Sequence, residues 1–286
     1  MKIVVLGVSG LIGRYVFSEL SSSFDVIGTT TKNYNDISET KFFSKNKNIL
    51  YDFKILNYES CFKKLEEIQP KYILNCIGIT KRKINDNILD VLEVNSVFPH
   101  KLARWSQNFN IKIIHFSTDC VFDGNKGYYS DLDIPNAKDL YGKSKGLGEI
   151  IYDNALTIRS SFIGFEQFDK TELLEWVLSQ NNKSIFGYKK TMYSGVSALF
   201  LAQFVKKIIL EKININGLFN LAPKKPISKY DLIKLIILEF NLNINLIPEK
   251  EKIHNPTLNG EELRKKIDFK IPNWTEMIKD LIRNKI

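Results

Sequence analysis

The chain has 286 residues, a formal net charge of +9, and 44% hydrophobic and 26% charged residues, which are the proportions of a globular protein with room for one large α/β domain. No apolar run approaches the roughly 20 residues that span a bilayer, and no basic block or nucleic-acid motif accompanies the positive charge, so neither a membrane nor a nucleic-acid partner is expected. The cysteines Cys61, Cys76 and Cys120 are scattered without CxxC spacing, which argues against a disulfide framework or a zinc site, and no other metal-ligand cluster is evident.

Short apolar runs alternate with helical patterns in the first half of the chain. The predicted strands, rich in β-branched residues, are 2–8, 25–30, 48–53, 72–78 and 111–118. The predicted helices, with apolar residues at helical spacing, are 11–23, 57–69 and 90–109. This alternation predicts an α/β fold with a doubly wound parallel sheet of the Rossmann-like type. Because no signal-peptide cleavage site follows the first apolar run, we expect a cytoplasmic protein.

The segment "GVSGLIG" places Gly7, Gly10 and Gly13 directly after the first predicted strand and at the opening of the first helix. Glycines at such a turn let the backbone approach a pyrophosphate, and the helix start at Leu11 and Ile12 offers N–H donors to the anion. The spacing is GxxGxxG, one residue longer than the commonest dinucleotide fingerprint. The turn therefore predicts a dinucleotide cofactor.

The end of the second predicted strand indicates which dinucleotide binds. An NAD enzyme usually carries an acid there for the ribose 2′-OH, whereas this chain has Thr30, Thr31 and Lys32. Two hydroxyls and an ammonium suit a 2′-phosphate, so we expect NADPH, with NADH as the alternative. Asp52, after the third strand, is a candidate acceptor for the adenine amino group.

A pair for proton transfer follows the fifth strand. Thr118 in "HFSTDCVFDG" ends that strand and should face the crevice at the carboxyl edge of the sheet. Tyr141 and Lys145 follow in "DLYGKSKGLGE", where one helical turn brings them to the same face. Tyr230 and Lys234 have the same spacing but lie beyond the sheet, so the context selects the first pair. An ammonium beside a phenol should lower its pKa and make it a better proton donor to a ketone.

After residue 163 the pattern loosens, and a smaller lobe is expected beside the sheet. The predicted strands are 156–164 and 217–223, and the predicted helices are 171–180, 198–212 and 228–240. A loop is predicted over 186–197 and a two-helix tail over 255–286. We divide the chain into a cofactor-binding domain, 1–162, that carries the Thr/Tyr/Lys set and a substrate-binding lobe, 163–286. The boundary is approximate, because strands of the second part can return to the sheet.

The order of a glycine turn, "STD" and "YGKSK" resembles that of extended short-chain dehydrogenase/reductases, and among them the dTDP-4-dehydrorhamnose reductase family. The resemblance extends to "NCIGIT", "VNSVFPHKLA", "LTIRSS" and "PNW", and so covers nearly the whole chain. It implies an NADPH-dependent oxidoreductase acting on a nucleotide-diphosphate sugar, namely a 4-keto-6-deoxyhexose for surface polysaccharide such as lipopolysaccharide. It does not specify the nucleotide, the sugar or the oligomeric state, for which a homodimer is one candidate.

The resemblance also assigns roles to single residues. Tyr141 would donate the proton, Lys145 would tune it and hold the nicotinamide ribose, and Thr118 would orient the substrate carbonyl. The further residues that it places at the cofactor are Asn75, Cys76, Ile77, Asn95 and Ser117. Asn95 either supports the proton relay or makes a structural hydrogen bond.

The triplet "TDC" separates related activities. Dehydratases that resemble this family carry "TDE", and here Asp119 is followed by Cys120, so water elimination is not expected. A cysteine at this place is found in bifunctional 3,5-epimerase/4-reductases, which makes Cys120 and Asp119 candidate acid/base groups, with Lys170 as a second one from the lobe. The alternative is a small wall residue. A non-catalytic NADP-binding regulatory subunit, like the partner of methionine adenosyltransferase, is a third reading.

Substrate contacts are expected from the second half of the chain. The segment "GYKKTMYSG" should lie over the crevice, where Lys189 or Lys190 could meet a diphosphate and Tyr193 a nucleobase. Arg159, after the sixth strand, is predicted to face the same cleft.

Overall fold

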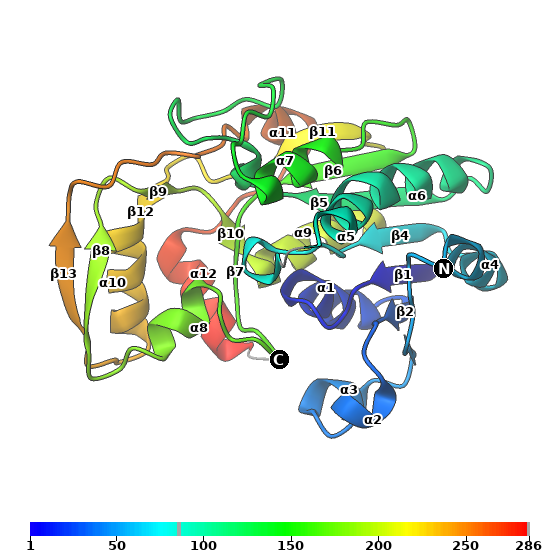
Figure 1. Cartoon of the computed structure of the whole chain (residues 1–286), viewed down its shortest axis with the longest axis horizontal. Helices are drawn as coiled ribbons and strands as arrows, with labels where there is room; N and C mark the ends of the chain where they lie inside the picture. The colour runs from blue at the N-terminus through cyan, green and yellow to red at the C-terminus, as the bar shows by residue number, and fades with distance from the viewer. Residues whose placement is uncertain (85–86, 285–286) are drawn as a thin grey trace.

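A sheet of seven parallel strands forms the centre of the computed structural model, which describes residues 1–84 and 87–284 (Figure 1). In order across the sheet the strands are β11 (Gly217–Asn220), β6 (Ala155–Arg159), β5 (Lys112–Ser117), β4 (Tyr72–Asn75), β1 (Lys2–Leu6), β2 (Asp25–Thr29) and β3 (Ile49–Leu50). The strand order reverses between β1 and β4, and in such sheets ligands bind at that point, outside the carboxyl ends of the strands. The predicted doubly wound α/β fold is therefore confirmed.

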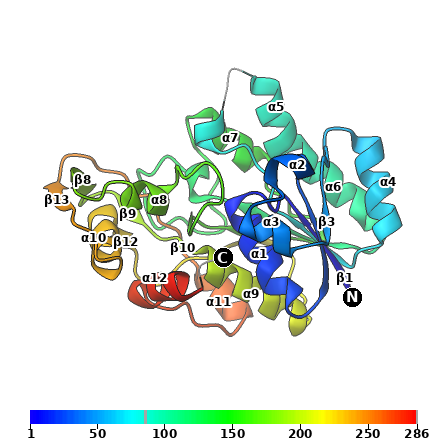
Figure 2. The same cartoon turned by 90° about the horizontal axis from the view of Figure 1, so that it is seen from below.

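Helices cover both faces of the sheet. Seen from below in Figure 2, α1 (Leu11–Ser21) and α9 (Ala198–Leu210) lie on one side of the strands, and α4 (Tyr58–Ile68) and α6 (Phe98–Gln107) on the other. Alternate residues of β1 supply the two cores, Ile3 and Val5 on one face and Val4 and Leu6 on the other, all fully buried. Burial on both faces explains why the strands are nearly continuous apolar runs.

The second half of the chain builds a smaller lobe, at the left of Figure 1, and also returns to the sheet. In the lobe α10 (Lys229–Glu239) packs against α8 (Leu173–Leu178), α12 (Trp274–Arg283) and β8 (Ser184–Tyr188). The short strand pairs are β8 with β13 (Asn245–Glu249), β9 (Met192–Tyr193) with β12 (Ile227–Ser228), and β7 (Phe162–Ile163) with β10 (Val196–Ser197). Since β11 and α9 belong to the sheet layers, the boundary at residue 162 divides the chain only in part.

Several predicted elements differ from the observed ones. The predicted helix 90–109 is divided into α5 (Ile88–Leu92), a π-helical turn η2 (Glu93–Val97) and α6. The predicted strand 156–164 is two strands, β6 and β7. The predicted loop 186–197 is wrong, because β8, β9 and β10 pair there with segments distant in sequence, which no local pattern reveals.

The remaining elements are short. They are α2 (Tyr34–Ile37), α3 (Lys41–Lys45), η1 (Lys81–Lys83), η3 (Asp119–Val121), α7 (Leu140–Leu147) and α11 (Glu261–Lys266). Residues 285–286 of the predicted two-helix tail lie outside the described residues. Among the helices that the structure describes, none is long and apolar enough to cross a bilayer.

Candidate active site

The glycine turn joins β1 to α1 at the carboxyl edge of the sheet. Gly7 has a φ of +85°, in the region that favours glycine, and a Cβ on Gly13 would lie 2.2 Å from the Gly7 carbonyl oxygen. A Cβ on Gly7 would lie 3.0 Å from Cγ1 of Ile77 in the turn after β4. The helix begins at Leu11 with Gly10 as its N-cap, so the backbone N–H groups of residues 11–13 are not bonded within the helix. This arrangement suits the binding of a phosphate group.

The segments after β2 and β3 lie together beside that turn. Thr30 is buried, whereas Thr31 and Lys32 are exposed, and the Lys32 N–H donates to Thr30 Oγ1 at 3.2 Å. The Asp52 N–H donates to the Lys32 carbonyl oxygen at 3.2 Å, and Asp52 has a φ of +52°. The structure therefore brings the four residues predicted to contact adenosine to one edge of the sheet.

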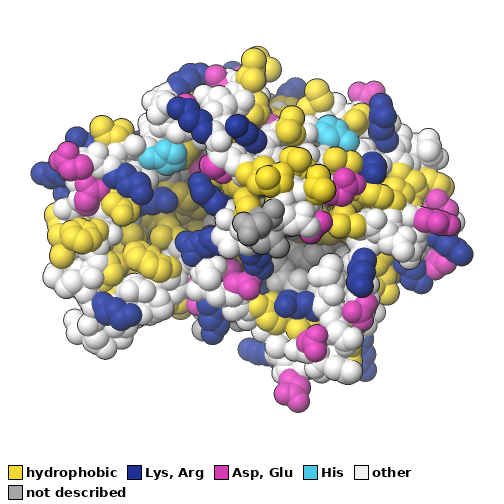
Figure 3. All heavy atoms as spheres, in the orientation of Figure 1, with side chains coloured by type: hydrophobic (Ala, Val, Ile, Leu, Met, Phe, Trp, Pro, Cys, Tyr) yellow, Lys and Arg dark blue, Asp and Glu magenta, His cyan; other side chains and the backbone are white. Residues whose placement is uncertain are grey.

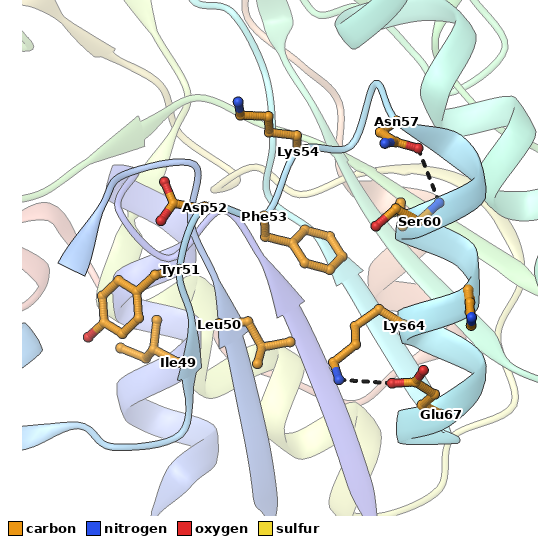
Figure 4. A pocket seen from close by; sticks show the side chains of 12 residues that line it. Ile49, Leu50, Tyr51, Asp52, Phe53, Lys54, Asn57, Ser60, Lys64 and Glu67 are labelled. Carbon is orange, nitrogen blue, oxygen red and sulfur yellow. Dashed lines mark hydrogen bonds and ion pairs between the residues drawn. The ribbon is translucent and has the colours of Figure 1, made fainter.

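A pocket of about 620 Å³ lies next to Asp52, between β3 and α4 (Figure 4). Phe53 and Lys54 line it from the strand side, and Lys64, paired with Glu67 at 2.8 Å, from the helix. Apart from Asp52, none of the predicted site residues lines this pocket.

The turn after β4 is held by a buried asparagine. Asn75 is 1% exposed, and its Oδ1 accepts from the Ile77 N–H at 3.2 Å, while its Nδ2 lies 3.2 Å from Nδ1 of His115. The Cys76 N–H donates to the Leu6 carbonyl oxygen at 3.1 Å. The predicted cofactor residues 75–77 thus form a turn fixed against the glycine turn.

Asn95 links that turn to the active-site helix. Its Oδ1 accepts from the Ile79 N–H at 2.8 Å, and its Nδ2 donates to the Ile79 carbonyl at 2.9 Å and to Ser144 Oγ on α7 at 3.1 Å. Asn95 is fully buried, and both amide hydrogens have acceptors. Its side chain therefore makes structural hydrogen bonds, one of the two roles that the sequence left open.

Thr118 and Tyr141 meet at the end of β5. Thr118 caps η3, since its Oγ1 accepts from the Cys120 N–H at 3.1 Å. A Cβ on Gly142 would lie 2.2 Å from the Cys120 carbonyl oxygen, so α7 approaches η3 closely. This approach brings the Tyr141 side chain to that of Thr118, which opposes the rise of the Tyr141 pKa. Thr118 and Tyr141 thus lie together after β5.

The electrostatics of Tyr141 differ from the prediction. Burial raises the pKa of Tyr141 above its ordinary value, and the Cys120 side chain raises it further, while the Thr118 side chain opposes the shift. The expected net lowering of this pKa is wrong in this structure, because burial outweighs any lowering by the Lys145 ammonium. The Lys145 ammonium instead donates to the Phe116 carbonyl oxygen at 2.8 Å. Tyr141 therefore stays protonated at neutral pH.

Lys145 itself is unusual for a lysine. It is 5% exposed, and burial lowers its pKa to about 8, against the opposing charge of Glu149. Nearly all of the ammonium's ordinary hydration is absent, so its charge depends on pH near neutrality.

The thiol of Cys120 and the hydroxyl of Tyr193 both lie near Asp119. Cys120 is exposed as a residue, but burial of its thiol raises the pKa to about 12, and the Asp119 charge adds to the shift. Burial also raises the pKa of Tyr193 well above its ordinary value, with Asp119, Glu172 and Cys120 adding to the shift. Tyr193 is 8% exposed and its ring lies 5.4 Å from the ring of Trp274, so Tyr193 packs in the core of the lobe and its predicted contact with a nucleobase stays a prediction.

Arg159 does not fit the predicted substrate role. It is 2% exposed, and its Nε and Nη2 donate to the two carboxylate oxygens of Glu149, each at 2.6 Å. Its Nη1 donates to the Asp131 carbonyl at 3.2 Å. Ser117, predicted at the cofactor, donates instead to Glu149 Oε1 at 2.7 Å. Because β5 and β6 align Ser117 with Arg159, both side chains donate to the buried carboxylate of Glu149.

Other lobe residues lie in places that the sequence did not specify. The Lys190 side chain is exposed. The Lys189 ammonium lies 4.9 Å from the ring centroid of Tyr230, which belongs to α10. His254 is a residue that sequence reasoning missed: a Cβ on Gly124 would lie 2.2 Å from its Nδ1. The bridge between Thr191 and His254 and the hydrogen bond from the Asn255 N–H to the Gly124 carbonyl oxygen, at 2.7 Å, place it there, and no local signal predicts such a pairing. In the described part of the chain no three His, Cys, Asp or Glu side chains are grouped to hold a metal ion.

The sheet, the glycine turn and the Thr118–Tyr141–Lys145 set define the chain as an extended short-chain dehydrogenase/reductase-like protein. The family model described as "RmlD substrate binding domain" matches residues 1–286, and the chain belongs to that family. This confirms the resemblance to dTDP-4-dehydrorhamnose reductases.

Individual relatives are distant. The chain is 27% identical over 191 residues to a dTDP-4-dehydrorhamnose reductase of Aggregatibacter actinomycetemcomitans, covering 63% of this chain and 65% of that one. It is 23% identical over 264 residues to the methionine adenosyltransferase 2 subunit beta of Bos taurus, covering 84% and 72%. The crystal structure of dTDP-4-dehydrorhamnose reductase from Bacillus anthracis in complex with NADP has a TM-score of 0.82, with 18% identity over 99% of each chain, which shows a shared fold.

Proposed function

We propose that this protein is an NADPH-dependent reductase of a nucleotide-linked 4-keto-6-deoxyhexose that serves surface polysaccharide synthesis. The observation that carries the proposal is the placement of Tyr141 beside Thr118, with Lys145 one helical turn away, at the carboxyl edge that also bears the glycine turn. The named activity of the Aggregatibacter relative and the NADP in the Bacillus structure support it. Figure 3 shows a hollow between the lobes with Lys and Arg side chains at its rim, which suits an anionic sugar nucleotide.

The residues divide the reaction among them. The N–H groups of residues 11–13 would bind the cofactor pyrophosphate and Lys32 its 2′-phosphate, and bound NADPH supplies a hydride for the carbonyl carbon. Thr118 orients the carbonyl, and the Tyr141 hydroxyl gives its proton to the carbonyl oxygen. The Lys145 ammonium stabilises the tyrosinate that remains until solvent returns the proton.

The experiment that tests this function is NADPH oxidation with a panel of dTDP-, UDP- and GDP-linked 4-keto-6-deoxy sugars in D2O, followed by NMR of the products. We expect turnover of at least one sugar without deuterium at C3 or C5, after correction for spontaneous exchange. Silence across the whole panel with NADPH bound would contradict the proposal. Co-purification of another enzyme would then favour the regulatory subunit, the function named for the Bos taurus relative.

A bifunctional epimerase/reductase is the second candidate function. Cys120 favours it, because its thiol lies beside Thr118. His254, from the opposite lobe, favours it as well, because its imidazole lies near Asp119. The Asp119 charge raises the pKa of His254, although burial lowers that pKa by more. A neutral thiol can supply a proton at the carbon beside the ketone. Enzyme-dependent deuterium at C3 or C5 that disappears in Cys120→Ser would establish this activity.

The lowered pKa of Lys145 predicts a pH dependence. Its folded pKa of about 8 lies below the ordinary lysine value, so the ammonium that stabilises the tyrosinate is lost as pH rises through that value. We expect kcat/KM to fall up to tenfold per pH unit above about pH 8. In Lys145→Arg the fall should begin at a higher pH, because a guanidinium keeps its charge. The free energy of unfolding should instead rise with pH between the folded pKa of Lys145 and its ordinary value, because the unfolded chain binds more protons in this range. A kcat/KM profile that stays flat to about pH 10 would refute the assignment.

A further inference from the structure

A segment of the lobe is fastened over the start of α1. Residues 164–169, here called the strap, follow β7, and a Cβ on Gly164 would lie 3.1 Å from the side chains of Leu11 and Tyr15. The Phe165 N–H donates to the Tyr15 hydroxyl at 3.2 Å. The guanidinium of Arg14, which is 1% exposed, donates to the Phe165 carbonyl and, at 2.9 Å, to Gln167 on the strap. The strap thus begins directly above the helix whose N-terminus closes the glycine turn.

The far end of the strap reaches two other loops at the same edge of the sheet. The ring of Phe168 lies 4.5 Å from the Lys32 ammonium, after β2, and 6.1 Å from the ring of Phe43. Asp169 forms an ion pair with Lys83, in the segment after β4. Since the strap contacts α1 and the loops after β2 and β4, it crosses the crevice in which a dinucleotide lies in this fold.

These contacts determine how Lys32 is presented. An exposed lysine has a long, flexible side chain, and holding it in one place costs conformational entropy. The face of the Phe168 ring attracts the ammonium and restricts it, while its N–H groups away from the ring stay available. Asp169 also lies near the Lys32 ammonium, which helps to lower the pKa of its carboxyl, but its ion-pair partner is Lys83. Among the described residues no carboxylate forms an ion pair with Lys32, which leaves its ammonium for an incoming phosphate.

We propose that Phe168 is a positioning residue that acts through Lys32 and sets the preference of the protein for a cofactor with a 2′-phosphate. The inference rests on the proposed use of NADPH and adds a residue from the opposite lobe to cofactor recognition. Phe168 is then the element of the strap that distinguishes NADPH from NADH, which lacks the phosphate that Lys32 binds.

The test compares the dissociation constants of NADPH and NADH by fluorescence titration of the full chain, without any sugar substrate. Phe168→Leu keeps an apolar side chain but has no aromatic face, and we expect it to lower the NADH/NADPH ratio of dissociation constants about 2- to 5-fold. Phe168→Tyr keeps the ring and should keep the ratio. Lys32→Met should lower the ratio further, and Phe168→Leu should add nothing to it in the Lys32→Met background.

The outcomes distinguish failure of the positioning role of Phe168 from failure of the proposed NADPH-dependent function. An unchanged ratio in Phe168→Leu, whether or not both cofactors bind more weakly, would overturn the positioning role and leave the proposed use of NADPH standing. An additive effect of Phe168→Leu in the Lys32→Met background would overturn it as well. Failure of the unaltered protein to bind either cofactor would instead overturn the proposed function.

Discussion

Replacement of Tyr141 by phenylalanine is expected to abolish reduction of the keto sugar while NADPH still binds. The hydroxyl is the proposed proton donor to the carbonyl oxygen, and loss of such a general acid lowers kcat by about 10²- to 10⁴-fold. The substitution removes one hydroxyl and keeps the ring, so the effect on stability should be small. The measurement is single-turnover NADPH oxidation beside a fluorescence titration of NADPH.

Tyr230 provides the matched control for this variant. It has the same spacing to a following lysine, Lys234, but belongs to α10 in the small lobe. Tyr230→Phe should leave kcat within about twofold of the unaltered protein, because it removes one hydroxyl and keeps the ring that packs on Gly187 and Lys189. If Tyr141→Phe kept most of the activity, proton donation by Tyr141 would be disproved.

Replacement of Arg159 by methionine should lower the free energy of unfolding by about 3–5 kcal/mol, because it leaves the Glu149 carboxylate buried without its partner. The two side chains are 3% and 6% exposed, so solvent screens their interaction little. Urea unfolding of the variant and the unaltered protein, with equal m-values, measures the difference. The loss should appear in stability before it appears in the affinity for any sugar nucleotide.

Removal of both charges tests the same pair from the other side. Arg159→Met combined with Glu149→Leu should recover much of the lost stability, since no unpaired charge remains. Lys207→Met removes an exposed helix pair with Glu211 and should cost no more than about 0.5 kcal/mol. A single Arg159→Met variant as stable as the unaltered protein would show that the guanidinium is free to bind substrate after all.

The sequence predicted those parts of the site that depend on neighbours in the chain. Gly7, Gly10 and Gly13 act within one turn, and Tyr141 and Lys145 within one helix, so their spacing predicts their geometry. The alternation of strands and helices likewise predicts the parallel sheet. Local patterns sufficed because a turn and a helix are built from contacts a few residues apart.

The tertiary structure decided what depends on contacts between distant segments. Arg159 was predicted to bind substrate, and the fold pairs it with Glu149; Lys145 was expected to lower the pKa of Tyr141, and burial raises it instead. Phe168 meets Lys32 only because the strap returns over the crevice. Thus the sequence by itself determined the class of the fold and the place of Tyr141 and Lys145 on one helix. Burial and long-range packing decide the charge state of that pair, the partner of each buried ion and the residues that reach the site from the lobe. The spacing of residues along the chain does not predict these contacts.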